Sequence, residues 1–343
     1  MPRAGSQTVG LPIAIGSDSE ASVRLTDAIE GDSDASLRRD DLHKGSLPWV
    51  HRIRRLVVDL VGGDGDVLPN DAACMAHKNL GTMRFVDVEE ARAAAAAAPG
   101  VRLVLVGATP SPWSEAAKGI FVTKGIDGML VRFSPSDAAV KQWTGFHNAP
   151  VLFIDSEPPR AHWSDILEAA ERLGGRASLV PADADERTRM FGLAHELMGE
   201  GGLVWNGRLL VIHRGLTTEG RDGFPLRLSS YLAPKYGYAP DRAVAAKDRV
   251  LSVLERFGRL VEGSRARGKE YLFGDRLSAL DIYLATALAP FAPLPEDQCP
   301  GVHPAMRHAF ETAYPELTAA VPAALREHRD LMYGRHLGLP IEL

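Results

Sequence analysis

Three short segments in the middle of the chain, at 102–106, 128–133 and 151–155, each contain an unbroken apolar run. Runs of aliphatic and β-branched residues without an alternating polar face are typical of strands buried on both sides. Residues 114–124 and 164–173 carry apolar side chains at helical spacing instead. The order strand, helix, strand, strand, helix predicts an α/β domain over residues 101–176.

After Pro181 the pattern changes to helices alone, predicted at residues 187–198, 242–262, 279–288 and 305–313. In the longest of them, Val250, Leu254, Phe257 and Val261 fall on one face because they are spaced by 4, 3 and 4 residues. We therefore predict an all-helical C-terminal domain over residues 186–343.

The first hundred residues lack a comparable pattern and contain polar, glycine-rich turns at 31–34 and 62–66. There are two exceptions: a basic and apolar stretch at 49–61, and a helix at 88–98 that Pro99 and Gly100 end. We predict an N-terminal extension over residues 1–100, partly disordered and loosely attached up to residue 85. The basic stretch is either an interaction segment or, more commonly, a solvated helix face.

Charge and composition narrow the range of partners. The 343 residues include 39 Lys and Arg against 44 Asp and Glu, a net charge of −5, which gives no general attraction to nucleic acid or to an anionic membrane. No stretch reaches the ~18–20 apolar residues of a membrane helix, and no secretory signal is readable. Two cysteines, Cys74 and Cys299, suit a reducing compartment. We expect a soluble cytoplasmic protein with no nucleic-acid or membrane partner.

Candidate chemistry begins after the first strand, at Ser111-Pro112-Trp113-Ser114. Ser111 stands where a helix N-cap belongs, and Pro112 suits the first helical position. A helix N-terminus stabilises an anion placed against it. Taken alone, such a serine is most often only a cap.

Two further segments matter for the comparison with known folds. Pro150, in Asn148-Ala149-Pro150-Val151, leads into the third strand; from the residues alone a trans proline is favoured, because only about 5–6% of such bonds are cis. Near the C-terminus, Ser278 and Asp281 form a capping box. That box is a folding signal and carries no chemistry. The basic loop 265–269 suggests no site either.

Together these three segments resemble those of the glutathione transferase family. Residues 111–114 resemble the thioredoxin-type active-site turn with serine in place of cysteine, residues 148–151 are similar to the cis-proline segment, and residues 271–281 are similar to the capping motif of the helical domain. The resemblance covers residues 101–340. It implies an α/β thioredoxin-like domain followed by an all-α domain, with the N-terminal extension outside it.

The resemblance also implies a reaction. Ser111 would donate a hydrogen bond to the sulfur of glutathione, the co-substrate, and hold it as a thiolate that attacks an electrophilic small molecule. Thr109 and Ser114 are the alternative hydroxyls. A cis Pro150 would let the Val151 backbone pair with the cysteinyl part of glutathione. No metal is implied, and a homodimer is possible.

One departure concerns the γ-glutamyl end of glutathione. Family members have an acidic or amide residue followed by serine ahead of the last helix of the first domain, where this chain has His162 and Trp163. Arg160 or Ser164 could pair with the γ-glutamyl carboxylate instead. The helical domain would supply the second-substrate pocket, with these candidates: Trp113, Trp205, Arg208 and Tyr236. Buried aromatics and a solvated arginine are the plainer account of these four residues.

Two alternatives to a transferase remain to be weighed. A non-catalytic protein of the same fold, used for ligand binding or protein assembly, is favoured by His162-Trp163 and by the unmatched first hundred residues. A glutathione-dependent disulfide reductase is disfavoured, because residues 101–298 contain no cysteine to supply the attacking thiolate.

Overall fold

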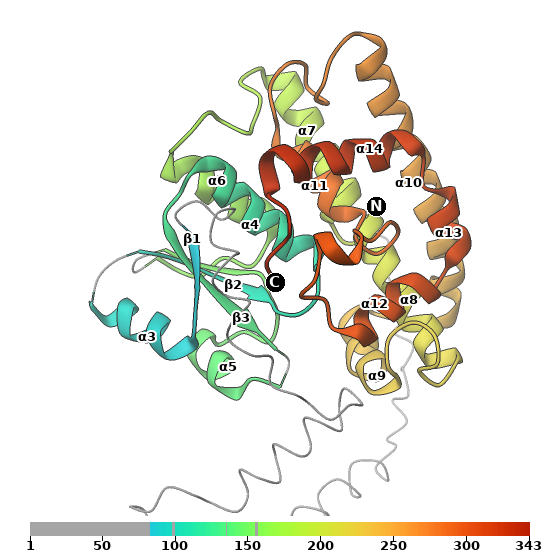
Figure 1. Cartoon of the computed structure of the whole chain (residues 1–343), viewed down its shortest axis with the longest axis horizontal. Helices are drawn as coiled ribbons and strands as arrows, with labels where there is room; N and C mark the ends of the chain where they lie inside the picture. Colours follow the sequence, from blue (N-terminus) through green and yellow to red (C-terminus); the bar gives the residue numbers. More distant parts are fainter. Residues whose placement is uncertain (1–82, 98–99, 135, 155–156) are drawn as a thin grey trace, which may run out of the picture. The chain divides into compact units, whose positions relative to one another are not determined.

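The structure is a computed structural model that describes residues 83–97, 100–134, 136–154 and 157–343 (Figure 1). The predicted turns at 31–34 and 62–66 and the basic stretch at 49–61 lie outside the described residues. So does most of the segment predicted to be partly disordered and loosely attached up to residue 85; its last three residues are wrongly predicted, because they lie in the strand Met83–Val86.

A four-stranded sheet with the order β1-β3-β2-β4 forms the first domain (Figure 1). Its strands are β1 (Met83–Val86), β2 (Val101–Val106), β3 (Gly128–Phe133) and β4 (Val151–Ile154). Strands β1 and β2 pair with β3 in parallel, and β4 runs antiparallel to β2. This mixed order is the thioredoxin-like sheet that the sequence predicts.

Helices cover both faces of the sheet, which explains why its strands read as unbroken apolar runs. Leu103, Leu130 and Leu152 pack on one side with α4 (Pro112–Lys124) and α6 (Trp163–Leu173). On the opposite side, Val104 and Val131 pack with α3 (Val88–Ala97) and α5 (Ala138–Thr144). Neighbouring residues of one strand therefore serve different cores, as the two-residue period of a strand requires.

The sheet begins before residue 101, where the sequence analysis places the domain boundary. Met83 pairs with Gly128, so β1 forms an edge beside β3, and α3 returns the chain from it. The helix predicted at 88–98 is α3. Strand β1 gives almost no sequence signal, because it has only four residues and the side chain of Arg84 is exposed.

The second domain is all-helical, as predicted. Its α-helices are α7 (Ala184–Met198), α8 (Leu203–Thr217), α9 (Leu226–Lys235), α10 (Pro240–Ala266), α11 (Ala279–Ala287), α12 (Pro304–Thr312), α13 (Pro315–Ala320) and α14 (Ala323–Met332). A short 3₁₀ turn at Glu296–Gln298 and a π-helical turn at Tyr333–Leu337 complete it. Helix α11 is buried along its whole length and begins with the predicted capping box, where the Ser278 amide donates to Asp281 Oδ2 at 2.9 Å.

Hydrogen bonds join the two domains close to the Ser111 turn. The indole Nε1 of Trp113 donates to the carbonyl of Met198 at 2.8 Å, and the amide of His303 donates to the carbonyl of Ala108 at 3.0 Å. On the other side of α4, Lys118 donates to the carbonyl of Glu342. The helical domain therefore holds the loop between β2 and α4 from outside.

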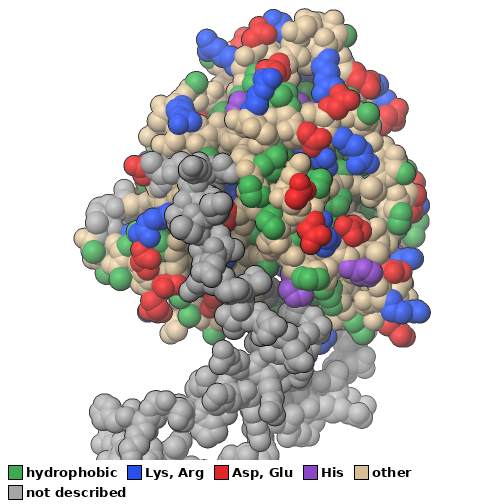
Figure 2. All heavy atoms as spheres, viewed as in Figure 1, with side chains coloured by type: hydrophobic (Ala, Val, Ile, Leu, Met, Phe, Trp, Pro, Cys, Tyr) green, Lys and Arg blue, Asp and Glu red, His purple; other side chains and the backbone are tan. Residues whose placement is uncertain are grey.

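The exposed charges of the described residues are mixed in sign. On the face drawn in Figure 2, Lys and Arg side chains alternate with Asp and Glu side chains, and apolar patches lie between them. In the part of the chain that the structure describes, no helix is both long enough and apolar enough to span a bilayer.

Candidate functional site

Three segments meet at one edge of the sheet. Val104 of β2 pairs with Val151 of β4, and Leu152 of β4 pairs in turn with Arg160. Because both pairings are antiparallel, the end of β2, the start of β4 and the start of α6 lie at the same edge. We call this place the β2–β4 edge and define it by residues 107–111, 149–150 and 160–164.

Ser111 occupies the N-cap position of α4, as predicted. Its carbonyl accepts from the amide of Glu115 at 2.8 Å, and its amide donates to the carbonyl of Thr109 at 2.7 Å. The side chain is only 3% exposed, yet its hydroxyl makes no capping hydrogen bond. The hydroxyl is thus free to donate to a ligand at the positive end of the helix.

The two alternative hydroxyls differ in what they already do. Ser114 is buried, and its Oγ accepts from the amide of Val106 at 3.1 Å, which ties the first turn of α4 to the end of β2. The half-buried Thr109 contributes its carbonyl to the Ser111 turn. Ser114 is therefore committed to the fold, and Ser111 is not.

The Ala149–Pro150 bond is cis, as the family resemblance implies and contrary to the trans bond favoured from the residues alone. Leu152 exchanges backbone hydrogen bonds with Arg160 at 2.7 and 2.9 Å, on the side of β4 away from β2. Since successive residues of a strand bond to opposite sides, Val151 directs its amide and carbonyl toward Val104. The Val151 backbone thus belongs to the sheet, whereas the Ala149 backbone makes no hydrogen bond within the described residues.

The two terminal nitrogens of the Arg160 guanidinium differ in their contacts. Its Nη2 donates to Glu157 Oε2 at 2.6 Å, and Arg172 donates to the same carboxylate at 2.7 Å. Hydrogen bonds from Arg160 and Arg172 hold the pKa of Glu157 below its ordinary value. The Nη1 of Arg160 is buried and has no hydrogen-bond partner among the described residues. Buried donors are nearly always paired, so this atom is a candidate donor to a bound ligand.

The N-terminus of α6 is largely satisfied by its own residues. Ser164 Oγ donates to Asp165 Oδ1 at 3.1 Å and lies 2.8 Å from the Nδ1 of His162. Trp163 turns inward, with its ring edge-on to Tyr283 at a centroid distance of 5.4 Å. Its Nε1 is a second buried donor that finds no partner in the described part of the chain. Of the predicted glutathione ligands, Arg160 offers a spare donor, and Ser164 already has neighbours on both sides.

The four residues predicted for the second-substrate pocket lie together. The ring centroid of Tyr236 is 4.8 Å from that of Trp205 and 6.4 Å from that of Trp113. The Arg208 guanidinium carbon stands 6.0 Å from the Tyr236 ring centroid. We call Trp113, Trp205, Arg208 and Tyr236 the aromatic cluster.

Lys235 lies close enough to Arg208 of the aromatic cluster to feel its charge. This residue was not predicted from the sequence, because only its position next to Tyr236 in the chain connects it with the cluster. Burial and the nearby positive charge of Arg208 lower the pKa of its ammonium group. Within the described residues, neither Arg208 nor Lys235 forms an ion pair with a carboxylate. Arg208 lies against the ring of Tyr236, and Lys235 is its neighbouring charge. Two cations without a carboxylate partner near these rings suit an aromatic ligand that carries a negative charge.

Two further observations concern metal ligands and the described thiol. Among the residues that the structure describes, no three His, Cys, Asp or Glu side chains gather as ligands for a metal ion. Burial, and secondarily the charge of Glu115, raise the pKa of Cys299 to about 12, so this thiol is protonated at neutral pH.

A model of a known protein family matches part of the helical domain. Residues 241–323 match the family model described as "Glutathione S-transferase, C-terminal domain". The resemblance to this family that the sequence motifs indicate is thereby confirmed. No curated protein sequence matches the chain.

Several solved structures are similar to this one. A glutathione S-transferase of Methylobacillus flagellatus KT, with glutathione bound, has 15% identity and a TM-score of 0.49, and the match covers 69% of this chain and 96% of that one. For a glutathione S-transferase of Methylobacterium radiotolerans in complex with glutathione sulfonate, the values are 18% and 0.46, over 69% and 92% of the two chains. A Burkholderia graminis glutathione transferase with two glutathione molecules per subunit gives 16% and 0.46, over 69% and 85%.

Proposed function

We propose, from the match of residues 241–323 to the glutathione S-transferase C-terminal domain and from the thioredoxin-like sheet that precedes it, that this chain is a glutathione transferase. In the proposed reaction, glutathione binds at the β2–β4 edge, and its sulfur attacks an electrophilic small molecule. The observation that carries the proposal is the Ser111 hydroxyl, which stands at the N-cap of α4 without a capping bond.

The energies available at Ser111 are adequate for this chemistry. A free thiol has a pKa of about 8.5, so only a few per cent is thiolate at neutral pH. A hydrogen bond to a charged group contributes roughly 1.5–3 kcal/mol, and a helix N-terminus adds about 0.3–1 kcal/mol. Since about 1.4 kcal/mol corresponds to one pKa unit, the two together lower the thiol pKa by about one to three units.

The rest of glutathione would be held by groups that have bonding capacity left. The buried Nη1 of Arg160 and Nε1 of Trp163 are donors for carboxylate or carbonyl oxygens of the peptide. The unbonded amide and carbonyl of Ala149 replace Val151 in our assignment, because the Val151 backbone pairs with β2. Pro150 orders this segment and, like Ser164, is a candidate contact rather than a source of charge.

The second substrate in this proposal is an aromatic electrophile with an acidic group. The rings of the aromatic cluster would stack on it, and Arg208 and Lys235 would neutralise its charge. Two points stay predictions. The family resemblance implies that the protein forms a homodimer, and the sequence pattern indicates that it lies in the cytoplasm.

The test is a calorimetric titration of the full chain with reduced glutathione, combined with ultraviolet difference spectra that detect the thiolate. We expect binding and a thiolate band at pH 7. Ser111→Ala should still bind glutathione but lose the band, whereas Thr109→Val, the matched hydroxyl in the same loop, should keep it. Absence of binding at several millimolar glutathione would overturn the proposal.

A second candidate function is ligand binding without catalysis. The observation that favours it is the low exposure of Ser111, 3%, which restricts access to its hydroxyl. This candidate predicts that glutathione or another ligand binds, but that no thiolate band appears and that Ser111→Ala changes nothing. The same two measurements therefore separate the two functions.

A further inference from the structure

The last six residues that the structure describes connect the two domains. After the π-helical turn, residues 338–343 leave the helical domain, pass along α4 and reach β3 (Figure 1). Ile341 and Leu343 are buried members of the main hydrophobic core. Where this segment begins, Leu337 lies so close to Gly119 of α4 that a Cβ atom on the glycine would come within 2.5 Å of it. We call residues 338–343 the strap.

Two cations of the first domain hold the end of the strap. Lys118 of α4 donates to the carbonyl of Glu342. Arg132 of β3 donates from Nε to the backbone oxygen of Leu343 at 2.6 Å, and its Nη2 lies 3.4 Å from Oε1 of Glu342. The guanidinium carbon of Arg132 also lies 3.8 Å from the ring centroid of Phe85 in β1. These contacts fix the strap against the sheet domain, although it comes from the helical domain.

Arg132 links the strap to the start of the loop that carries Ser111. In the sheet it pairs with Leu105 of β2, two positions before this loop begins. Gly107 is the first residue of the loop, and its amide donates to the carbonyl of Phe133 at 3.0 Å. A Cβ atom on Gly107 would lie 3.3 Å from the Cβ of Arg132. The side chain that binds the strap therefore also flanks the loop.

A second connection runs through residues 298–303. The amide of Ile341 donates to the carbonyl of Gln298 at 2.9 Å. At the other end of this segment, the amide of His303 donates to the carbonyl of Ala108 at 3.0 Å. One short segment thus contacts the strap at its first residue and the Ser111 loop at its last.

Ile341 also approaches the loop directly. Ile341 and Pro110 both line a cavity of about 10 Å³, which has room for about one water molecule. Pro110 is the residue before Ser111 in the chain. An apolar side chain of the strap therefore lies next to the turn that sets the position of the Ser111 hydroxyl.

We propose that the strap positions Ser111, with Arg132 and Ile341 as positioning residues. Neither of these two belongs to the β2–β4 edge; each acts through the loop at 107–111, whose backbone directs the Ser111 hydroxyl. A donor stabilises a developing charge fully only when it is held within about 0.5 Å of its productive position. The strap therefore controls how strongly the site stabilises the thiolate, and not how tightly it binds the rest of the peptide. This inference rests on the proposed transferase function.

The first test is hydrogen exchange of the full chain without ligand, measured in a peptide that covers residues 107–111. Ile341→Ala and Arg132→Met should each speed exchange in this peptide at least about tenfold, because the loop opens more easily when a contact that holds it is lost. Methionine keeps the aliphatic stem that flanks Gly107 and removes the bonds to the strap.

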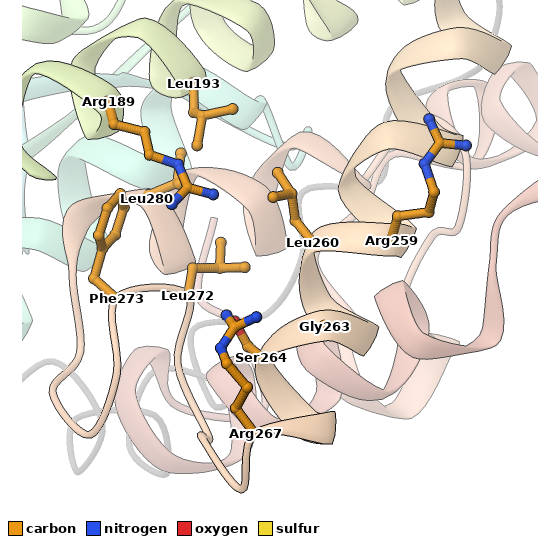
Figure 3. Close-up of a pocket in the computed structure, with 10 residues that line it drawn as sticks. All are labelled: Arg189, Leu193, Arg259, Leu260, Gly263, Ser264, Arg267, Leu272, Phe273 and Leu280. Atoms are coloured by element: carbon orange, nitrogen blue, oxygen red, sulfur yellow. The ribbon is translucent and has the colours of Figure 1, made fainter.

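A matched control removes an arginine elsewhere. Arg259 of α10 lines the pocket drawn in Figure 3, and its charge is paired with Glu255. Neither the strap nor the loop at 107–111 contributes a residue to that pocket. Arg259→Met should therefore change exchange in the 107–111 peptide less than about twofold.

The second test measures the pH at which the thiolate band of bound glutathione is half developed. Arg132→Met and Ile341→Ala should raise this midpoint by about half a unit to one unit, a fraction of the lowering that a complete hydrogen bond to the thiolate provides. S-methylglutathione carries the same peptide without an ionisable thiol. It should bind to the native chain and to both variants with affinities within about twofold of one another.

Four results would overturn the proposal. The first two are unchanged exchange in both variants and an equal change in Arg259→Met. The third is faster exchange with an unchanged thiolate midpoint, which would mean that the strap holds the loop without affecting the chemistry. The fourth is a loss of S-methylglutathione binding as large as the loss of the thiolate.

Two further outcomes are covered by the design. Should Ile341→Ala fail to fold, Arg132→Met decides, because the Arg132 side chain is exposed. Hydrogen exchange requires no glutathione. Absence of a thiolate band in the native chain would therefore overturn the transferase function, while the exchange rates still show whether the strap holds the Ser111 loop.

Discussion

The Nε2 of His328 lies 3.4 Å from the Oδ1 of Asp281, and both side chains are almost completely buried. The pair links α14 to the capping box of α11, yet this Nε2 makes no hydrogen bond to any of the residues that the structure describes. Burial raises the pKa of Asp281 to about 6 and lowers the pKa of His328 to about 4. Both shifts favour the neutral form of the group, and the nearby positive charge of Arg265 lowers the pKa of His328 further.

These two shifts act on stability in opposite directions. Between pH 4 and pH 6, folded Asp281 keeps a proton that the unfolded chain has largely lost, so this group lowers the free energy of unfolding as pH rises. Over the same range, folded His328 lacks a proton that the unfolded chain binds, so it raises the free energy of unfolding. In the native protein the two slopes largely cancel.

Replacing one member of the pair should expose the slope of the other. We expect the free energy of unfolding of His328→Gln, relative to the native protein, to fall by about 2–3 kcal/mol from pH 4 to pH 6, since one proton is worth about 1.4 kcal/mol per pH unit. Asp281→Asn should show the reverse slope. Urea unfolding at several pH values measures both, and parallel pH curves for all three proteins would contradict the assignment.

Ser111 and Ser114 stand three positions apart, but removal of their hydroxyls should have different effects. Ser111→Ala should lower turnover of an aromatic electrophile at least about tenfold, a loss of about 1.4 kcal/mol in transition-state stabilisation, while the melting temperature stays within a few degrees. Ser114→Ala should destabilise the fold by about 1–3 kcal/mol, because the partly buried amide of Val106 loses its acceptor. Thermal unfolding and steady-state kinetics on the same samples distinguish the two effects. A melting temperature that fell equally in both variants would show that Ser111 is only a cap.

The charges of the aromatic cluster should affect substrate binding selectively. Arg208→Gln and Lys235→Gln are each expected to raise KM several-fold for an acidic aromatic electrophile, and to leave KM for an uncharged analogue of the same shape nearly unchanged. High salt should produce the same selective effect. Lys247→Gln is a suitable control, because Lys247 is paired with Glu316 on an exposed surface. Equal changes for both electrophiles would assign the two residues to packing alone.

The buried pair of Glu115 and Lys118 offers a test of stability. Its charged atoms are 3.0 Å apart, and burial raises the pKa of Glu115 despite the attraction of Lys118. Glu115→Gln should destabilise the protein by about 3–5 kcal/mol, since it leaves the ammonium group buried without a carboxylate. Replacing both residues together, as Glu115→Leu with Lys118→Met, should restore most of this loss.

Urea unfolding measures these changes. An exposed pair provides the comparison: Glu255→Gln, which removes the carboxylate partner of Arg259, should cost less than about 1 kcal/mol. A loss in the double variant as large as in Glu115→Gln would show that the carbonyl of Glu342, which accepts from Lys118, depends on that donor.

Much of the fold follows from local patterns. The strands at 101–106 and 128–133 each contain an unbroken apolar run, and α10 repeats its apolar residues at helical spacing. Helix α8 is harder to predict from the sequence. It is buried on most sides, so its apolar residues are not confined to one face of the helix. Strand β1 is recognised only through its partner β3, which lies more than forty positions later in the chain.

The candidate site divides in the same way. Ser111 was proposed from a motif. The four residues of the aromatic cluster were named only as candidates for a pocket that the family resemblance implies, and the structure brings them together. The partner of Arg160 could not be proposed, since Glu157 reaches it only through the turn after β4. Likewise, the pairing of the Val151 backbone with β2 depends on the register between the two strands. The sequence of one strand alone does not specify that register.

The bond from the amide of His303 to the carbonyl of Ala108 has a practical consequence for engineering. Ala108 has a positive φ of 54°, an uncommon conformation for a residue with a side chain. A neighbour almost two hundred positions away holds the turn that carries Ser111. A chimera that transplants this thioredoxin-like domain onto a foreign helical partner must therefore bring an equivalent of residue 303, or the grafted turn will lose the brace that shapes it.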